Sequence, residues 1–170
     1  DTTGSLAGSD TINGNGGEDT IFGDVSPSGG VPDTLNGAAD SITGDADTDL
    51  ILAGGGNDTV YGYNGSDTTT SYGDILVGDA GNDNIFGDGG GDIIYGDVAP
   101  TVIYNESLPG SIAGFYDYNP DVGGADSLRG GNGDDAIFAG GGNDTVIGDG
   151  GNDLLNGDGG NDQVVGGIGY

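Results

Sequence analysis

The sequence of 170 residues contains no cysteine, histidine, lysine, methionine or tryptophan, and Arg129 is its only basic residue. The absence of cysteine excludes a disulfide framework and a thiolate metal site. Without histidine, lysine or cysteine the chain lacks the common general bases and nucleophiles, so we predict that it is not an enzyme. No apolar run approaches the length of a membrane-spanning helix.

Positive charge is almost missing, because 29 acidic residues stand against one basic residue and the formal net charge is −28. Nucleic acids and anionic membranes are bound mainly through clustered Lys and Arg, so the charge excludes both as partners. With 42 Gly and only 32% hydrophobic residues, the chain is also poorly supplied with core residues. Self-repulsion and the entropy of glycine oppose folding, so we expect bound cations to assist it.

Aspartate recurs at a regular interval along the chain. The most frequent separation is nine residues, and the residue two places later is aliphatic in fourteen of fifteen cases. The aspartates of this series are Asp10, Asp19, Asp33, Asp40, Asp49, Asp58, Asp67, Asp74, Asp83, Asp92, Asp126, Asp135, Asp144, Asp153 and Asp162. One apolar residue between polar neighbours favours a short half-buried strand, and the density of Gly and Asp opposes a helix. Stacked turns can pair such strands, which predicts a solenoid with columns of aliphatic side chains.

Within each repeat, Gly favours the first and fourth places and Asp holds the sixth, as in GDGGNDQVV from Gly157 to Val165. This pattern resembles the RTX (repeats-in-toxin) calcium-binding nonapeptide, GGxGxDxUx. The resemblance implies an all-β, right-handed parallel β-roll, or β-solenoid, whose short strands are joined by Gly/Asp turns that bind calcium. We expect a single array over residues 1–170, as a fragment of a longer protein, with one longer insertion at residues 98–120.

The resemblance also implies that the sixth-place aspartates are the side-chain ligands of Ca²⁺, which prefers hard oxygen donors. The expected ligands are Asp10, Asp19, Asp49, Asp58, Asp67, Asp83, Asp92, Asp126, Asp135, Asp144, Asp153 and Asp162. Asp33, Asp40 and Asp74 are expected to bind more weakly. In their repeats, Val31, Ala38 and Tyr72 replace the fourth-place glycine.

The resemblance also implies two repeats per coil, which would place alternate aspartates on opposite edges of the roll. One edge would then begin with Asp10, Asp33, Asp49 and Asp67, and the other with Asp19, Asp40, Asp58 and Asp74. One ion between neighbouring turns of the same edge gives at most about thirteen Ca²⁺, whose charge would nearly neutralise the chain. The second-place aspartates (Asp24, Asp45, Asp79, Asp88, Asp97, Asp149 and Asp158) could add ligands, but we favour a role in solvating the edges.

Residues directly after the buried aliphatics point outward, and several of them are aromatic. We expect a contact face made of Phe22, Tyr61, Tyr95 and Phe138. Exposed apolar patches usually mark a contact, which favours cover by the 98–120 insertion or by a neighbouring molecule. Cross-strand pairing of the rings within a sheet is the alternative.

The sequence therefore favours a calcium-binding structural module of a secreted bacterial protein. Calcium is scarce in the cytosol and plentiful outside, so the chain would fold on binding Ca²⁺ after export. The resemblance implies type I secretion and an extracellular or cell-surface location. Besides calcium ions, copies of the chain itself or a neighbouring domain are expected as partners. Two alternatives are a self-assembling extracellular filament or surface-layer protein of the same repeat family, and an ice-binding module carried by threonines before the aliphatics.

Overall fold

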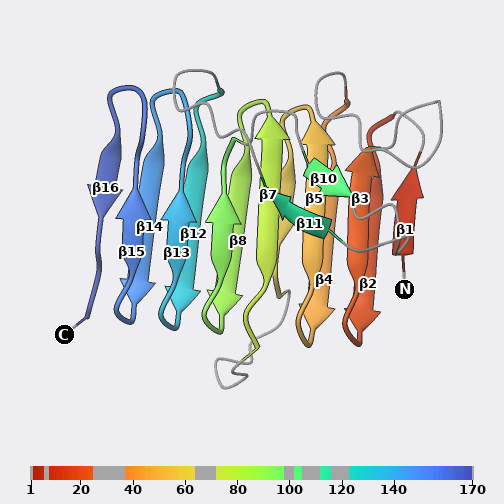
Figure 1. The fold of residues 1–170 in the computed structure, drawn as a ribbon, viewed down its shortest axis with the longest axis horizontal. Helices are drawn as coiled ribbons and strands as arrows, with labels where there is room; N and C mark the ends of the chain where they lie inside the picture. The colour runs from red at the N-terminus through yellow and green to blue at the C-terminus, as the bar shows by residue number, and fades with distance from the viewer. Residues whose placement is uncertain are drawn as a thin grey trace.

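A computed structural model describes residues 2–5, 8–24, 37–63, 72–97, 102–104, 112–115 and 123–169 of the chain. Within this part the chain forms sixteen strands and no helix, and accordingly no helix that could cross a membrane. Fourteen strands build two seven-stranded sheets, and Figure 1 shows the strands in a row along the long axis of the molecule. The other two, β10 (Val102–Tyr104) and β11 (Ile112–Phe115), pair antiparallel in a separate small sheet.

Successive strands alternate between the two large sheets, so that a coil contributes one strand to each. The odd-numbered sheet consists, in spatial order, of β1 (Thr2–Ser5), β3 (Thr20–Asp24), β5 (Leu50–Gly55), β7 (Ile75–Ala80), β9 (Ile93–Tyr95), β13 (Ala136–Phe138) and β15 (Leu154–Asn156). The even-numbered sheet consists of β2 (Thr11–Gly16), β4 (Ser41–Ala46), β6 (Thr59–Tyr61), β8 (Asn84–Gly89), β12 (Ser127–Asn132), β14 (Thr145–Gly150) and β16 (Gln163–Val165). Neighbouring strands in both sheets run parallel. The predicted parallel β-roll is confirmed.

The eighth-place aliphatic side chains form the core between the sheets. Their register is continuous, with Ile51 opposite Leu76 in one sheet and Val60 opposite Ile85 in the other. Most members of the two columns are at most 1% exposed, and only the terminal coils leave theirs partly open. Each strand thus adds one large side chain to the core, whose burial contributes roughly 1.5–3 kcal/mol. The core is built coil by coil and has no centre.

The turns between the sheets depend on left-handed backbone and on close approach of neighbouring coils. The fourth-place residues Gly81 and Gly142 have φ of 146° and 141°. A Cβ on Gly81 would also overlap the carbonyl oxygen of Gly56 in the preceding coil, and one on Gly142 would overlap that of Gly124. Glycine is required twice over at these places, once by φ and once by the backbone that stacks against it.

The order of coils differs from the predicted order at two places. β4 pairs directly with β2, and β5 pairs with both β3 and β7. Asp40, before β4, therefore lies on the edge of Asp10, and Asp49, before β5, lies on the opposite edge. The predicted edges were wrong between residues 33 and 74, because each aspartate of the irregular stretches was counted as one turn. Asp33 and Asp67 lie outside the described residues.

The four predicted contact residues do not share one face. Tyr61 lies in the even-numbered sheet and stacks on Phe86, with 5.0 Å between ring centroids. Phe22, Tyr95 and Phe138 lie in the odd-numbered sheet, where the last two stack at 5.4 Å. The prediction assigned Tyr61 to the wrong sheet, because of the same error in counting turns. The alternative of cross-strand ring pairing is confirmed for these two pairs.

A second apolar cluster lies on the outer face of the odd-numbered sheet. Its centre is Leu52 of β5 and Val77 of β7, both completely buried, with Phe22 and Tyr95 packed against them. Figure 1 draws β10 and β11 across β3, β5 and β7. Leu52 and Val77 are therefore covered although they point away from the core between the sheets.

Candidate metal-binding turns

The sixth-place aspartates form two hydrogen-bonded ladders, one on each edge of the roll. In each rung, the carboxylate Oδ1 accepts the backbone N–H of the aspartate one coil earlier, at 2.7–3.1 Å. The first, which we call the Asp10 ladder, consists of Asp10, Asp40, Asp58, Asp83, Asp126, Asp144 and Asp162. The second, the Asp19 ladder, consists of Asp19, Asp49, Asp74, Asp92, Asp135 and Asp153. From the second aspartate of each ladder onward, one carboxylate oxygen is therefore used in a hydrogen bond between coils.

The second carboxylate oxygen, Oδ2, is available for a ligand. Nine ladder aspartates bury Oδ2 without any hydrogen bond in the described part of the chain: Asp10, Asp40, Asp49, Asp58, Asp83, Asp92, Asp126, Asp135 and Asp144. Burying a charged oxygen without a partner is costly, and native structures rarely tolerate it. A regular row of such atoms indicates that an absent group satisfies them.

Six of these nine oxygens adjoin a gap that a first-place glycine leaves open, namely those of Asp40, Asp49, Asp83, Asp92, Asp126 and Asp135. A Cβ on Gly78 would lie within 3.0 Å of both Asp83 Oδ2 and the carbonyl oxygen of Gly96 in the next coil. The same pair of atoms, a carboxylate oxygen and a carbonyl oxygen, adjoins first-place glycines on both edges, among them Gly44, Gly62, Gly87 and Gly148. The glycines thus preserve small spaces bounded by oxygen atoms of two neighbouring coils.

Burial changes the acidity of the ladder carboxyls. Burial raises the pKa of Asp58, Asp83 and Asp135 to about 7 and that of Asp126 to about 8. The hydrogen bond from the previous coil lowers each pKa, and nearby carboxylates raise it further. Near neutral pH these turns either hold protons or need a cation to compensate the ionised carboxylates.

The donor set suits calcium. It consists of carboxylate and carbonyl oxygens, which Ca²⁺ takes in groups of six to eight, and no nitrogen or sulfur ligand is available to favour zinc or copper. In the described part of the chain, no three acidic side chains gather as one metal cluster. Backbone carbonyls must therefore supply most of the ligands. Together with these carbonyls, the aspartates of the turns fit calcium.

Asp40 and Asp74, expected to be weaker, occupy ordinary rungs. Asp40 Oδ1 accepts the N–H of Asp10 at 2.8 Å, and Asp74 Oδ1 accepts the N–H of Asp49 at 2.9 Å. Ala38 and Tyr72 stand in the fourth place of these two repeats, yet they do not displace the rungs. The expected distortion is absent at these two rungs. Asp33 and Asp67 lie outside the described residues.

Three second-place aspartates are buried, contrary to the solvating role that we favoured. Asp24, Asp79 and Asp97 are 1%, 1% and 5% exposed, and all three lie in turns of the Asp10 ladder. Asp97 accepts the N–H of Gly124 at 3.1 Å, across the 98–120 insertion. This difference between the edges could not be predicted from the residues of each repeat, because it depends on which coil lies next to each turn.

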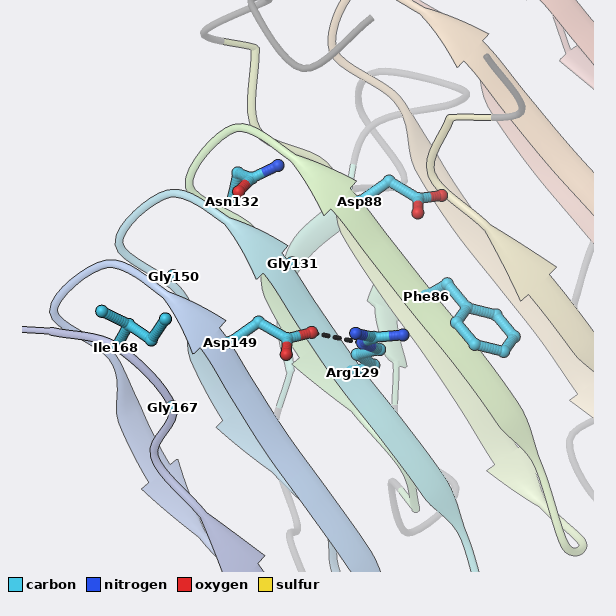
Figure 2. Close-up of a pocket in the computed structure, with 9 residues that line it drawn as sticks. All are labelled: Phe86, Asp88, Arg129, Gly131, Asn132, Asp149, Gly150, Gly167 and Ile168. Carbon is cyan, nitrogen blue, oxygen red and sulfur yellow. Dashed lines mark hydrogen bonds and ion pairs between the residues drawn. The ribbon is translucent and has the colours of Figure 1, made fainter. Parts of the chain in front are cut away.

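A hollow of about 450 Å³ lies on the outer face of the even-numbered sheet, away from the rungs of the ladders. Figure 2 shows Arg129 in it, with its guanidinium paired to Asp149 and with Phe86 nearby. The hollow also contains Asp88, Asn132 and Ile168. Its polar groups consist of one exposed ion pair, an amide and a carboxylate, with no histidine, cysteine or lysine in the sequence to act on a substrate.

The family model of the RTX calcium-binding nonapeptide repeat matches residues 6–25, 34–69, 68–98, 122–155 and 139–170. The chain belongs to this RTX repeat family. RTX repeats bind calcium, and the two ladders are the arrangement in which this RTX roll presents its aspartates. A search of curated proteins and a search of solved structures each returned no match.

Proposed function

We propose that the chain is a structural module of a secreted protein that folds when Ca²⁺ binds between neighbouring turns. The observation that carries the proposal is the row of nine buried Oδ2 atoms, five of which lie beside a glycine gap that faces a carbonyl oxygen of the next coil. Each rung would supply one anionic ligand, and the carbonyls of two coils would supply the others. Calcium would then link each coil to the next.

The ladders define which aspartates act as ligands in this proposal. They are Asp10, Asp40, Asp58, Asp83, Asp126, Asp144 and Asp162 on one edge and Asp19, Asp49, Asp74, Asp92, Asp135 and Asp153 on the other. One ion between neighbouring rungs gives six sites on the first edge and five on the second, so the described residues allow eleven Ca²⁺ in place of thirteen.

The need for calcium suggests where the module works. Without metal, ionised carboxylates would be buried a few ångströms from one another along each ladder, which opposes folding. Calcium levels in the cytosol are too low to fill such sites, whereas they are sufficient outside the cell. The chain would therefore stay unfolded until export and fold outside, which is compatible with type I secretion.

The two alternative functions receive less support. The self-assembly alternative was supported in part by a single aromatic face, but the four aromatic residues lie on two different sheets. The ice-binding alternative depended on a threonine ladder, but the rungs of the even-numbered sheet read Thr11, Ser41, Thr59, Asn84, Ser127, Thr145 and Gln163. This row mixes Thr, Ser, Asn and Gln, so it does not repeat one kind of side chain at regular spacing. We retain the calcium module.

Circular dichroism during a calcium titration tests the proposal. We expect β-structure to appear cooperatively as Ca²⁺ is added, to disappear with EDTA, and to be absent with Mg²⁺ at the same concentration, because Mg²⁺ demands a tighter octahedral site. Equal β-structure in calcium-free buffer at pH 8 would refute the proposal.

A further inference from the structure

Asp79 is a buried carboxylate that the ladders do not use. It stands in the second place of its repeat, directly after Gly78, and is 1% exposed. Neither of its carboxylate oxygens has a hydrogen-bond partner in the described part of the chain. The only basic side chain of the protein, Arg129, is engaged with Asp149 on the outer face of the even-numbered sheet.

The charged neighbours of Asp79 make this isolation more costly. Asp83 and Asp58, consecutive rungs of the Asp10 ladder, are the groups whose negative charge acts on it, and both repel its ionised form. An ionised carboxylate in such a place is tolerated only with a compensating cation. A structural role through hydrogen bonding does not account for Asp79, because it makes no such bond there.

The turn around Asp79 contains the other parts of a cation site. The backbone N–H of Asp79 donates to the carbonyl of Gly96 at 3.0 Å. That carbonyl oxygen and Asp83 Oδ2 bound the gap beside Gly78, the residue before Asp79. One short turn therefore brings together two buried carboxylates and a carbonyl of the next coil.

We propose that Asp79 is an additional calcium ligand in the turn of Asp83, at a site that has one more carboxylate than the repeat provides. The proposal rests on the proposed function, because it assumes that calcium occupies the turns. One coil earlier on the same edge, Gly54 stands opposite Asp79 in the sheet and supplies no carboxylate. The sites are therefore unequal, and the Asp79 site binds Ca²⁺ more tightly than its neighbours, since affinity rises with the number of charged ligands.

The chain contains a matched control for this ligand. Asp88 also stands in the second place after a glycine, and its φ of 73° equals that of Asp79. It differs in being exposed and in lying on the edge of the Asp19 ladder. Asn tolerates the same backbone conformation, so Asp79→Asn and Asp88→Asn make the same chemical change in a buried and an exposed turn.

Calcium titration calorimetry of the full chain separates the outcomes. For Asp79→Asn we expect the tightest class of sites to weaken about tenfold or to lose one ion, whereas Asp88→Asn should match the native chain. If both variants and the native chain show the same number of ions and the same affinities, the role of Asp79 is refuted while the proposed function stands. If the native chain takes up no calcium, the proposed function itself fails.

A folding defect can be distinguished from a lost ligand. If Asp79→Asn does not reach the native circular dichroism spectrum in saturating calcium, Asp79→Gly takes its place. Glycine accepts φ of 73° and already holds the equivalent place at Gly54. A folded Asp79→Gly chain that lacks the tightest site supports the assignment, and one that keeps it overturns the assignment.

Discussion

The substitution Asp83→Asn should change stability in opposite directions with and without calcium. Burial raises the pKa of Asp83 from 3.8 to about 7 in the metal-free fold. Ionising this carboxyl at pH 8 therefore costs up to about 4 kcal/mol more in the metal-free fold than in the unfolded chain. Asn removes that cost, and its side-chain oxygen can still accept the N–H of Asp58, which Asp83 accepts at 2.9 Å. In EDTA at pH 8 the variant should be more folded than the native chain.

In calcium the same substitution removes an anionic ligand. If free Ca²⁺ is at a hundred times the dissociation constant of the site, loss of that site lowers the free energy of unfolding by about 2.7 kcal/mol. Urea unfolding followed by circular dichroism at pH 8, in EDTA and in calcium, measures both effects. Glu18→Gln removes the same charge from an exposed side chain and should stay within about 0.5 kcal/mol of native. A shift of the same sign in both buffers, or no loss in calcium, would contradict the role of Asp83 as a buried calcium ligand.

Three further predictions concern the gap, the core and pH. Gly78→Ala places a methyl group against Asp83 Oδ2, so calorimetry should show at least one Ca²⁺ fewer, whereas Gly16→Ala, which meets no atom within 4 Å, should keep the native number. Ile85→Ala, which truncates a completely buried side chain, should lower the free energy of unfolding in calcium by about 2–5 kcal/mol; a loss below about 1 kcal/mol in urea unfolding would contradict the continuous column. Acid should stabilise the metal-free fold, because raised pKa values such as about 8 for Asp126 mean that the folded chain holds more protons than the unfolded one. That stability is complete below pH 3.8 and is lost as the pH rises through about 6 to 8, so β-structure in EDTA should increase on acidification; a decrease would contradict the pKa shifts.

The period of nine was sufficient to predict the fold and the composition of the core. A buried aliphatic two places after each aspartate can satisfy its packing only by stacking on the next coil, and Ile51, Leu76 and Ile94 do so in register. The aspartates of the regular runs, such as Asp126 and Asp144, were likewise predictable, because regular spacing and the two repeats per coil implied by the resemblance place them in successive turns of one edge.

The irregular stretches could not be resolved from spacing. Asp33 and Asp67 lie in glycine-containing stretches like those of the other aspartates, so each was counted as one turn. Hydrogen bonds between coils show which aspartates share an edge, since Asp40 Oδ1 accepts the N–H of Asp10 and Asp83 Oδ1 accepts the N–H of Asp58. Counting Asp33 as one turn assigns the following aspartates to the wrong edge, and counting Asp67 as one turn returns the later ones to the correct edge.

The burial of second-place aspartates was also beyond the sequence. Asp79 and Asp88 stand in nearly identical sequence contexts and share the same φ, yet one is buried and the other exposed. The difference arises from the neighbouring coils and from the edge on which each turn lies. The local sequence carries no information on either, so the burial of these carboxylates could be recognised only from the structure.

Crystals of the calcium-loaded chain, measured for anomalous scattering of calcium, test the central claim most directly. We expect a row of ions along each edge, each between neighbouring coils and in contact with Oδ2 of a ladder aspartate such as Asp83 or Asp92. Calcium ions located only on the outer faces of the sheets, with the Oδ2 atoms of both ladders bonded to protein or water, would contradict it.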